Sequence, residues 1–282
     1  WTIRGFNAGI AAAVLIPFAI YVRFAPGRWL FIILLLLMIP LATTELGTDA
    51  WIKDLMGPAM ADLGTQLFGT PLSGGWVLIY SATVMMILRF FSGPLVRWFG
   101  PLGLLAISAG AAAIGLVTLS AVSGLIILLA ATVYAIGQTF FWPCMIGVVS
   151  ERFPRGGALT INTIAGVGML GAGIIGAVLL GNVQDKQVDQ DLATQHPALH
   201  EQVVGDEQLS VFGTYRAVDP QLLGQLPDED QQVIQDIRDN AKQAALFEVA
   251  VLPLGVCIGF IILIVYFKAR GGYQPIDLAH GE

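Results

Sequence analysis

The acidic residues best placed for chemistry lie in one short segment, TTELGTDAWIKDLM, inside a long apolar stretch. Glu45 and Asp49 are one helical turn apart, and Thr44 and Thr48 repeat that spacing, so a helix here is polar along one side. Inside a membrane an ionised side chain is costly unless it is paired or hydrated. The pattern therefore predicts a helix side that faces a cavity, with Glu45 and Asp49 as candidate substrate or proton sites and Thr48 beside them.

Two neighbours of this segment leave alternatives open. Lys53 follows Asp49 by four residues and could form an ion pair with it near the membrane interface, which would be a structural role. Trp51 could stack on a ring of a bound solute, or it could anchor the helix end at the interface, as tryptophans often do. We expect a functional role more for Glu45 than for Asp49.

A second group of polar candidates lies in the later apolar stretches. Gln138 and Trp142 are four residues apart in YAIGQTFFWP and precede Pro143, which would kink a helix and expose carbonyl groups. Asn162 follows a short polar loop. Each of these side chains could instead pack against, or bond to, a neighbouring helix.

Other chemistries have little support in the sequence. His196 and His200 could share a metal on one helix face, but Pro197 lies between them and no cysteine is near, so two solvated histidines are the favoured interpretation. Cys144 and Cys257 fall in apolar segments, where a thiol commonly packs as a small apolar residue. P-loop, HExxH and GxSxG patterns are absent from the sequence. We expect no enzyme activity, no catalytic residues, no cofactor or metal, and no binding of nucleic acid.

The elements that carry these residues are membrane helices. Hydrophobic residues make up 56% of the chain and charged residues 12%, and no charged residue occurs between Trp98 and Ser150. A bilayer crossing needs about 20 apolar residues, so this run must fold back once, near Ser120 to Gly124. The prediction is an all-α integral membrane protein, a helical bundle of about seven crossings with a long exterior loop before the last. The expected spans are 6–22, 29–57, 75–96, 101–119, 124–148, 158–181 and 246–267.

Basic residues predict the orientation of these spans, because cytoplasmic loops are enriched in lysine and arginine. One face collects Arg23, Arg28, Arg89, Arg97, Arg152, Arg155, Lys268 and Arg270. We expect that face, and the C-terminus, in the cytoplasm. The division of the chain is then 1–28 (a helix and connector), 29–181 (helices), 182–245 (an extracytoplasmic insertion) and 246–282 (the last helix and a tail). The insertion holds twelve acidic residues against four basic ones, and its PDEDQQVIQDIRDN segment predicts a helix leading into the last span.

The segment RFFSGPLVRWFGP, which joins two spans, resembles the short cytoplasmic loop motif of the major facilitator superfamily, G-x-L-[AV]-D-[RK]-x-G-[RK]-[RK]. Gly93, Leu95, Val96 and Gly100 hold matching positions, whereas Arg97 replaces the motif's acid. In that superfamily the loop locks helices during alternating access. The resemblance implies a locking role for this loop, to which Arg89 and Pro94 also belong.

Two further stretches are similar to the same superfamily, nearest to its sugar-permease and nucleoside-permease branches. Residues 43–56 resemble its seventh helix, and residues 140–181 its tenth and eleventh helices with the loop between them. The resemblance implies that residues 29–270 correspond to the C-terminal six-helix half, whose partner is an N-terminal six-helix half. Since the chain begins at Trp1 without a signal-peptide pattern, we expect a truncated N-terminus.

The function expected from these features is secondary active transport of a small polar solute by alternating access. Glu45 is the hypothesised proton site of a symporter-type permease, in the lipid bilayer of a cell membrane such as the bacterial inner membrane. The alternative is a non-transporting membrane scaffold that presents the acidic exterior segment to a partner.

Overall fold

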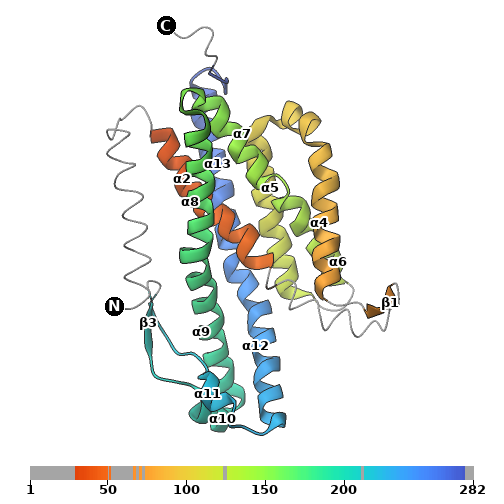
Figure 1. Ribbon diagram of the computed structural model, residues 1–282, viewed down its shortest axis with the longest axis vertical. Coiled ribbons are helices and arrows are strands. Elements are labelled where there is room, and N and C mark those ends of the chain that lie inside the picture. Colours follow the sequence, from red (N-terminus) through yellow and green to blue (C-terminus); the bar gives the residue numbers. More distant parts are fainter. Residues whose placement is uncertain are drawn as a thin grey trace.

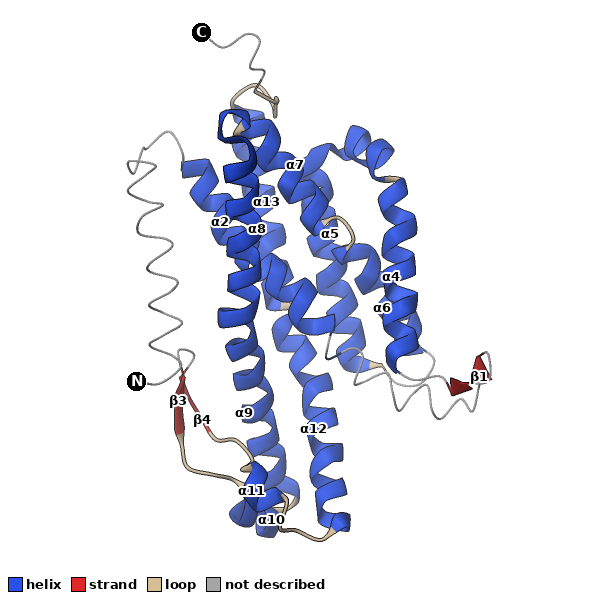
Figure 2. Cartoon of the chain, viewed as in Figure 1, coloured by secondary structure: helices blue, strands red, loops and turns tan. Residues whose placement is uncertain are grey.

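The computed structural model describes residues 29–49, 51, 66–67, 70–71, 74–122, 126–210 and 213–276. Helices dominate this part of the chain (Figures 1 and 2). Two small antiparallel strand pairs accompany them: β1 (Gln66–Leu67) with β2 (Thr70–Pro71), and β3 (Gln208–Ser210) with β4 (Gly213–Tyr215).

The predicted all-α membrane architecture is confirmed in its coarse form. Within the described ranges, five helical segments are long and apolar enough to cross a membrane: Trp29–Gly47, Ser92–Ala121, Ile126–Arg152, Pro154–Gln195 and Asp228–Ala269. Helix α4 (Gly74–Phe90) is shorter, and its 17 residues would extend about 26 Å against a hydrocarbon core of about 30 Å. The expected span 6–22 and Lys53 lie outside the described residues.

Most of these long segments are interrupted rather than straight. The first joins α2 (Trp29–Ala42) to a π-helical stretch η2 (Thr43–Gly47), and the third joins α6 (Ile126–Gln138) to α7 (Phe141–Arg152). The fourth begins with the 3-10 turn η3 (Pro154–Gly156) and then comprises α8 (Gly157–Leu170), the π-helical stretch η4 (Gly171–Gly176) and α9 (Ala177–Gln195). The last comprises α12 (Asp228–Val249) and α13 (Val251–Ala269).

The loop motif at residues 89–101 turns in two steps instead of one. Helix α4 ends at Phe90, earlier than the predicted boundary at 96, and α5 (Ser92–Ala121) starts immediately after a turn at Phe91. At Gly100 the backbone takes φ 69°, a left-handed conformation that glycine adopts without strain, and the helix direction changes there. The following Pro101 cannot donate a hydrogen bond to Arg97, which reinforces the bend.

The membrane part packs around α5, which contacts both α6 and α13, while α2 packs against α8, η4 and α13. Glycines allow the closest approach: a Cβ atom at Gly115 of α5 would lie 2.6 Å from the Tyr134 Cα atom of α6. Helix α4 packs mainly against α6 at the edge of the bundle, as Figure 1 shows.

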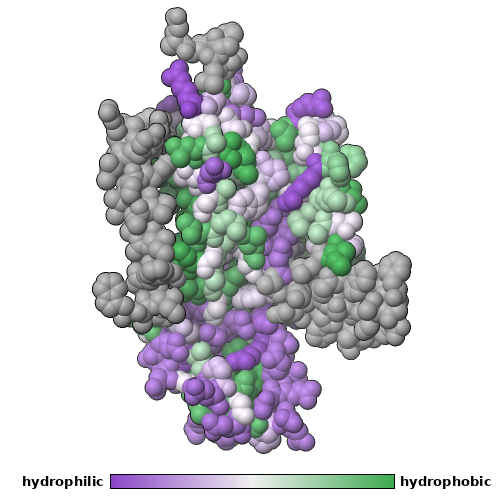
Figure 3. All heavy atoms as spheres, viewed as in Figure 1, coloured by the Kyte–Doolittle hydropathy of each residue, from purple (hydrophilic) through white to green (hydrophobic). Residues whose placement is uncertain are grey.

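A polar lobe extends from one end of the bundle. Helix α9 continues to Gln195, fourteen residues past the predicted end of its span, and lies beside α12, which begins at Asp228 as the acidic first turn predicts. The helices α10 (Pro197–Val203) and α11 (Pro220–Leu223) close the lobe, which appears purple at the lower end in Figure 3. It has its own hydrophobic core: Val188, Leu192, Val203, Val218, Ile234, Ile237 and Ala241.

At the opposite end, the segment after α13 is bound to the end of α7. Ile276 N donates to the Glu151 carbonyl (2.9 Å), and Arg152 Nη1 donates to the Gln274 carbonyl (2.6 Å). Tyr273 Oη donates to Glu151 Oε2 (2.7 Å), and burial together with this carboxylate raises the pKa of Tyr273, so the hydroxyl keeps its proton. The end of α7 and the segment after α13 are therefore held together by three hydrogen bonds.

Candidate functional site

The candidate site starts from a widened turn in the first described helix. Pro40 has no N–H group, and Thr44 Oγ1 donates back to the Pro40 carbonyl (2.8 Å), while Thr48 Oγ1 donates to the Thr44 carbonyl. Such back-bonding competes with the regular helical ladder, and the helix adopts π geometry over Thr43–Gly47. Single-turn π segments frequently occur at functional sites, and Glu45 lies in the centre of this one.

A second π segment, η4, lies directly against η2. Gly176 makes this contact possible, because a Cβ atom there would lie 2.7 Å from Thr43 Cγ2. A Cβ atom at Gly171 would similarly lie 2.9 Å from Ile39 Cγ1. The glycine-rich helix therefore packs backbone-close against the polar helix and supports it from one side.

Arg89 of α4 crosses to this polar turn. Its Nη2 lies 3.6 Å from Glu45 Oε1, and its Nε donates to the Thr139 carbonyl at 3.1 Å. The Thr139 carbonyl is free to accept because Pro143, four residues later, lacks the N–H group that a helix would supply. The guanidinium thus connects a carboxylate of η2 to the break between α6 and α7.

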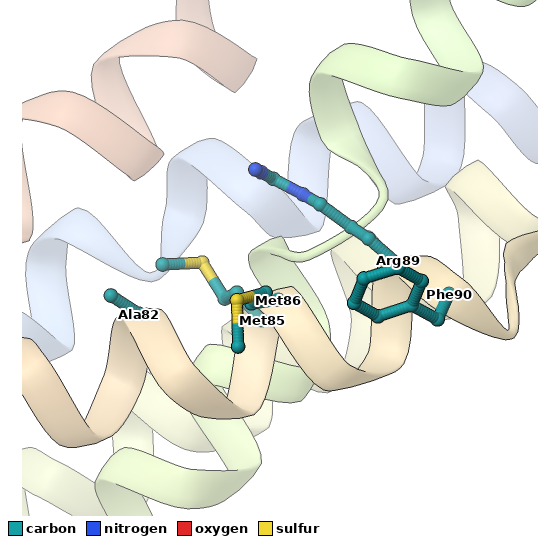
Figure 4. A pocket seen from close by; sticks show the side chains of 5 residues that line it. All are labelled: Ala82, Met85, Met86, Arg89 and Phe90. Carbon is teal, nitrogen blue, oxygen red and sulfur yellow. The ribbon is translucent and has the colours of Figure 1, made fainter.

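Figure 4 shows the side chain of Arg89 extending away from α4, with Met85, Met86 and Phe90 around its base. With Ala82, these residues line a cavity of about 330 Å³. The Glu45 side chain is only 9% exposed, whereas that of Arg89 is 43% exposed. Arg89 therefore stands between the open cavity and the buried carboxylate.

Two residues of α6 complete the polar cluster. Gln138 Nε2 donates to Asp49 Oδ1 at 3.0 Å, and Tyr134 Oη donates to the Thr44 carbonyl at 2.5 Å while also contacting Thr48 Oγ1. Gln138 and Tyr134 are both fully buried. We call the residues Thr44, Glu45, Thr48, Asp49, Arg89, Tyr134, Gln138 and Thr139 the polar cluster. Figure 3 shows hydrophilic side chains within the apolar part of the molecule, on the face between α8 and α4.

The structure brings together four of the seven predicted site residues: Glu45, Asp49, Thr48 and Gln138. Trp51 is buried in the main hydrophobic core. Trp142 packs against that core beside Gly168, and Asn162 is exposed on α8, so neither takes part in the polar cluster. Packing explains Trp142, as the alternative interpretation held.

Within the loop motif, only Arg89 contacts the cluster. Gly93, Pro94 and Arg97 lie exposed on the first turns of α5, where Arg97 Nε makes a long contact of 3.5 Å with the Gly93 carbonyl. Gly100 forms the bend described above. The expected locking role of the loop remains a prediction, and the charge that reaches the interior belongs to Arg89.

The sequence interpretation missed Tyr134, Thr139 and the pairing of Arg89 with Glu45. A signal for Tyr134 existed, because it is one turn before Gln138 in an otherwise apolar helix. Thr139 contributes only its backbone carbonyl, and a position for that group follows from Pro143 alone. The ion pair joins residues far apart in the sequence, and no local spacing indicates it.

Metal ligands do not gather in the described part of the chain, where no group of three or more His, Cys, Asp or Glu side chains could hold a metal ion. His200 Nε2 lies 2.7 Å from Asp189 Oδ1 in the lobe, whereas His196 forms the junction between α9 and α10. The two histidines therefore have different environments.

Comparisons of the chain with protein-family models, curated proteins and solved structures found no match. The geometry of the polar cluster and the sequence resemblance are therefore the basis on which a function can be proposed for the chain.

Proposed function

We propose that the chain is part of a secondary active transporter that moves a small polar solute through a membrane, with Glu45 as the proton-binding residue. The observation that carries this proposal is the Glu45–Arg89 ion pair, which lies between η2 and α4 among membrane-length apolar helices. Ionisable pairs at such positions are expensive to retain and usually mark a pathway for ions or substrates.

Interrupted helices add support to this interpretation. Transporter sites are typically formed where membrane helices are discontinuous, because freed backbone groups and polar side chains can then face a ligand. Here η2, η4 and the break before Phe141 surround or adjoin the polar cluster. The Thr139 carbonyl is such a freed group, and Arg89 occupies it in this structure.

The transport cycle we propose uses the two acceptors of Arg89. Protonation of Glu45 removes the charge that attracts the guanidinium, while the Thr139 carbonyl continues to accept from Arg89 Nε. The α4–η2 contact then weakens and the α4–α6 contact persists, so α4 can move with α6 relative to η2. By the resemblance to the major facilitator superfamily, these helices would act as a C-terminal half opposite an N-terminal six-helix half.

The test is substrate uptake by the protein reconstituted into proteoliposomes under an inward proton gradient. Glu45→Gln should reduce uphill uptake by at least about tenfold, because an amide cannot bind and release the proton that drives accumulation. Glu248→Gln is the matched control, because Glu248 is an exposed acid of a membrane-length helix. Undiminished proton-driven accumulation in Glu45→Gln would contradict the proposal.

A scaffold role has one observation in its favour, which is the separate hydrophobic core of the polar lobe. A scaffold would tolerate Glu45→Gln and Asp49→Asn and would lose partner binding when residues 182–245 are deleted. A transporter should show loss of uptake in the first two variants. The two functions therefore differ in which variant abolishes the measured activity.

A further inference from the structure

Two buried hydrogen-bond acceptors of the polar cluster have no donor. Glu45 Oε2 and Gln138 Oε1 are buried and have no hydrogen-bond partner in the described structure. The side chains that carry them are at least nine-tenths buried, since Glu45 is 7% exposed and Gln138 is 0% exposed. A buried acceptor without a donor costs free energy, so each of these oxygens favours any arriving group that can donate.

Three donors of the cluster, apart from the Arg89 guanidinium, are already engaged with other acceptors. Gln138 Nε2 donates to Asp49 Oδ1, and Tyr134 Oη donates to the Thr44 carbonyl. Thr48 Oγ1 likewise donates to the Thr44 carbonyl. Arg89 donates through Nε to the Thr139 carbonyl, and its Nη2 lies 3.6 Å from the other oxygen of the Glu45 carboxylate, Oε1.

The orientation of the Gln138 amide follows from its partner. Asp49 offers a carboxylate oxygen at 3.0 Å, and an ionised carboxylate only accepts hydrogen bonds, so the NH₂ group must face it. Rotating the amide would bring two acceptors together. With Asp49 ionised, Gln138 Oε1 is consequently the amide atom that has no partner.

We propose that the cluster recognises solutes through hydrogen-bond donors, hydroxyl or ammonium groups, received by Glu45 Oε2 and Gln138 Oε1. This inference rests on the proposed transport function and specifies its substrate class. Solutes that carry only acceptors, such as dicarboxylates without hydroxyl groups, could pair with the Arg89 guanidinium but would leave both oxygens without a donor, so we expect them to bind more weakly. Hydroxyl-rich neutral compounds and primary amines both supply the required donors.

Access from the cavity to the Glu45 carboxylate runs past Arg89. Its side chain lines the cavity of about 330 Å³ beside α4 and also contacts Glu45, so it separates the two. A displacement of the guanidinium from Glu45 would open the carboxylate toward the cavity while the Thr139 carbonyl retains Nε. The cavity wall of Ala82, Met85, Met86 and Phe90 is apolar and would contact the carbon skeleton of the solute.

The test compares compounds that have the same charge and carbon skeleton but differ in donors. Binding to the purified protein is measured as a rise in unfolding temperature, with D-glucose and myo-inositol against their fully O-methylated forms, and propylamine against its N-trimethylated form. At least one donor-bearing compound should stabilise the protein, and its methylated counterpart should not. The sugar pairs and the amine pair distinguish hydroxyl from ammonium donors, and succinate serves as the donor-poor anion.

The variant Gln138→Met tests whether Gln138 Oε1 accepts a hydrogen bond from the solute. The substitution should weaken binding of the stabilising compound by at least tenfold, because it removes this acceptor. Gln243→Met is the control, since Gln243 donates to the Leu119 and Val122 carbonyls outside the cluster. If Gln138→Met fails to fold, Gln138→Asn withdraws the same oxygen by one methylene and should also weaken binding.

Equal stabilisation by a compound and its methylated form would overturn the inference, as would stabilisation by none of the donor-bearing compounds. Proton-driven uptake of succinate into proteoliposomes, without binding of the donor-bearing compounds, would overturn this inference and leave the transporter proposal intact. Donor-dependent binding without uptake of any compound would support this inference and contradict the transporter proposal. The binding measurement therefore tests the substrate class, and the uptake measurement tests the transport function.

Discussion

At the scale of single residues, the position of the Arg89 side chain depends on Pro143. Proline removes one backbone donor from the helix, and the carbonyl that it leaves free at Thr139 accepts from Arg89 Nε. This bond holds the long arginine side chain in a direction from which its guanidinium can also reach Glu45. The helix break therefore has a specific effect on the position of a charge.

Replacing Pro143 should raise the stability of the protein and lower its uptake activity. In Pro143→Ala the new N–H group can bond to the Thr139 carbonyl, so the α6–α7 segment should become more stable, by up to about 3 kcal/mol. Arg89 loses its backbone acceptor at the same time, and we expect uptake to fall by about tenfold. Thermal unfolding and proteoliposome uptake measure the two effects.

The control for this variant is Pro253→Ala in α13. Pro253 also lies inside an apolar helix, where it is buried whereas Pro143 is exposed, and the described structure records no side-chain donor on the Val249 carbonyl, four residues before it. That variant should gain stability without losing uptake. If Pro143→Ala retained full uptake, the Thr139 carbonyl would have no role in positioning Arg89.

The sequence allowed the polar side of η2 to be predicted but not its partners. Glu45 and Asp49 follow from helical spacing in an apolar segment, which is a local property. The partner of Glu45 is 44 positions away and that of Asp49 is 89 positions away, so both depend on which helices pack together. Arg89 also occurs at a span end, where basic residues are common, and that context concealed its inward direction.

At the scale of elements, close packing between α5 and α6 positions Tyr134. A Cβ atom at Gly115 would lie 2.6 Å from Tyr134 Cα and 2.7 Å from Tyr134 Cβ, a contact that neither backbone can avoid without moving. Gly115→Ala should therefore destabilise the protein by about 1–3 kcal/mol and displace Tyr134 from the Thr44 carbonyl. Thermal unfolding of the purified protein measures the change in stability.

Gly166→Ala is the comparison for this substitution. Gly166 lies in the interior of α8, and a Cβ atom there would have no neighbour within 4 Å. Alanine should be neutral or stabilising by up to about 1 kcal/mol, because it reduces the conformational freedom of the unfolded chain. A similar loss of stability in both variants would contradict this explanation, because alanine at the open position of Gly166 meets no neighbour and should gain helix propensity.

The elements themselves were largely predictable, and the errors have physical causes. Apolar runs of about 20 residues indicate membrane helices, and the acidic turn after Pro227 indicates the start of α12. The helix that carries the span predicted for 158–181 continues to Gln195, because α9 extends through polar residues that pack against α12 and the second core. Hydropathy marks where a helix leaves an apolar environment and does not mark where the helix stops.

At the scale of the whole molecule, charge is distributed unevenly between the two ends. Arg152, Arg155, Lys268 and Arg270 lie at the turns that end α7 and α13, where the segment to Ile276 is bound. The opposite end carries the polar lobe, with most of the acidic residues. By the positive-inside rule we propose that the basic end is cytoplasmic and that the lobe is outside.

Cysteine labelling tests this orientation and, with it, the side from which protons reach Glu45. In a protein whose two native cysteines are replaced by alanine, Asp206→Cys places a thiol on the exposed surface of the lobe, and Arg155→Cys places one at an exposed position of the basic turn. A membrane-impermeant maleimide added to intact cells should label position 206, and it should label position 155 only after the membrane is permeabilised. The reverse pattern would place the lobe in the cytoplasm. The gradient used in the uptake experiment would then have to be inverted, because Glu45 would be loaded from the other side of the bilayer during accumulation.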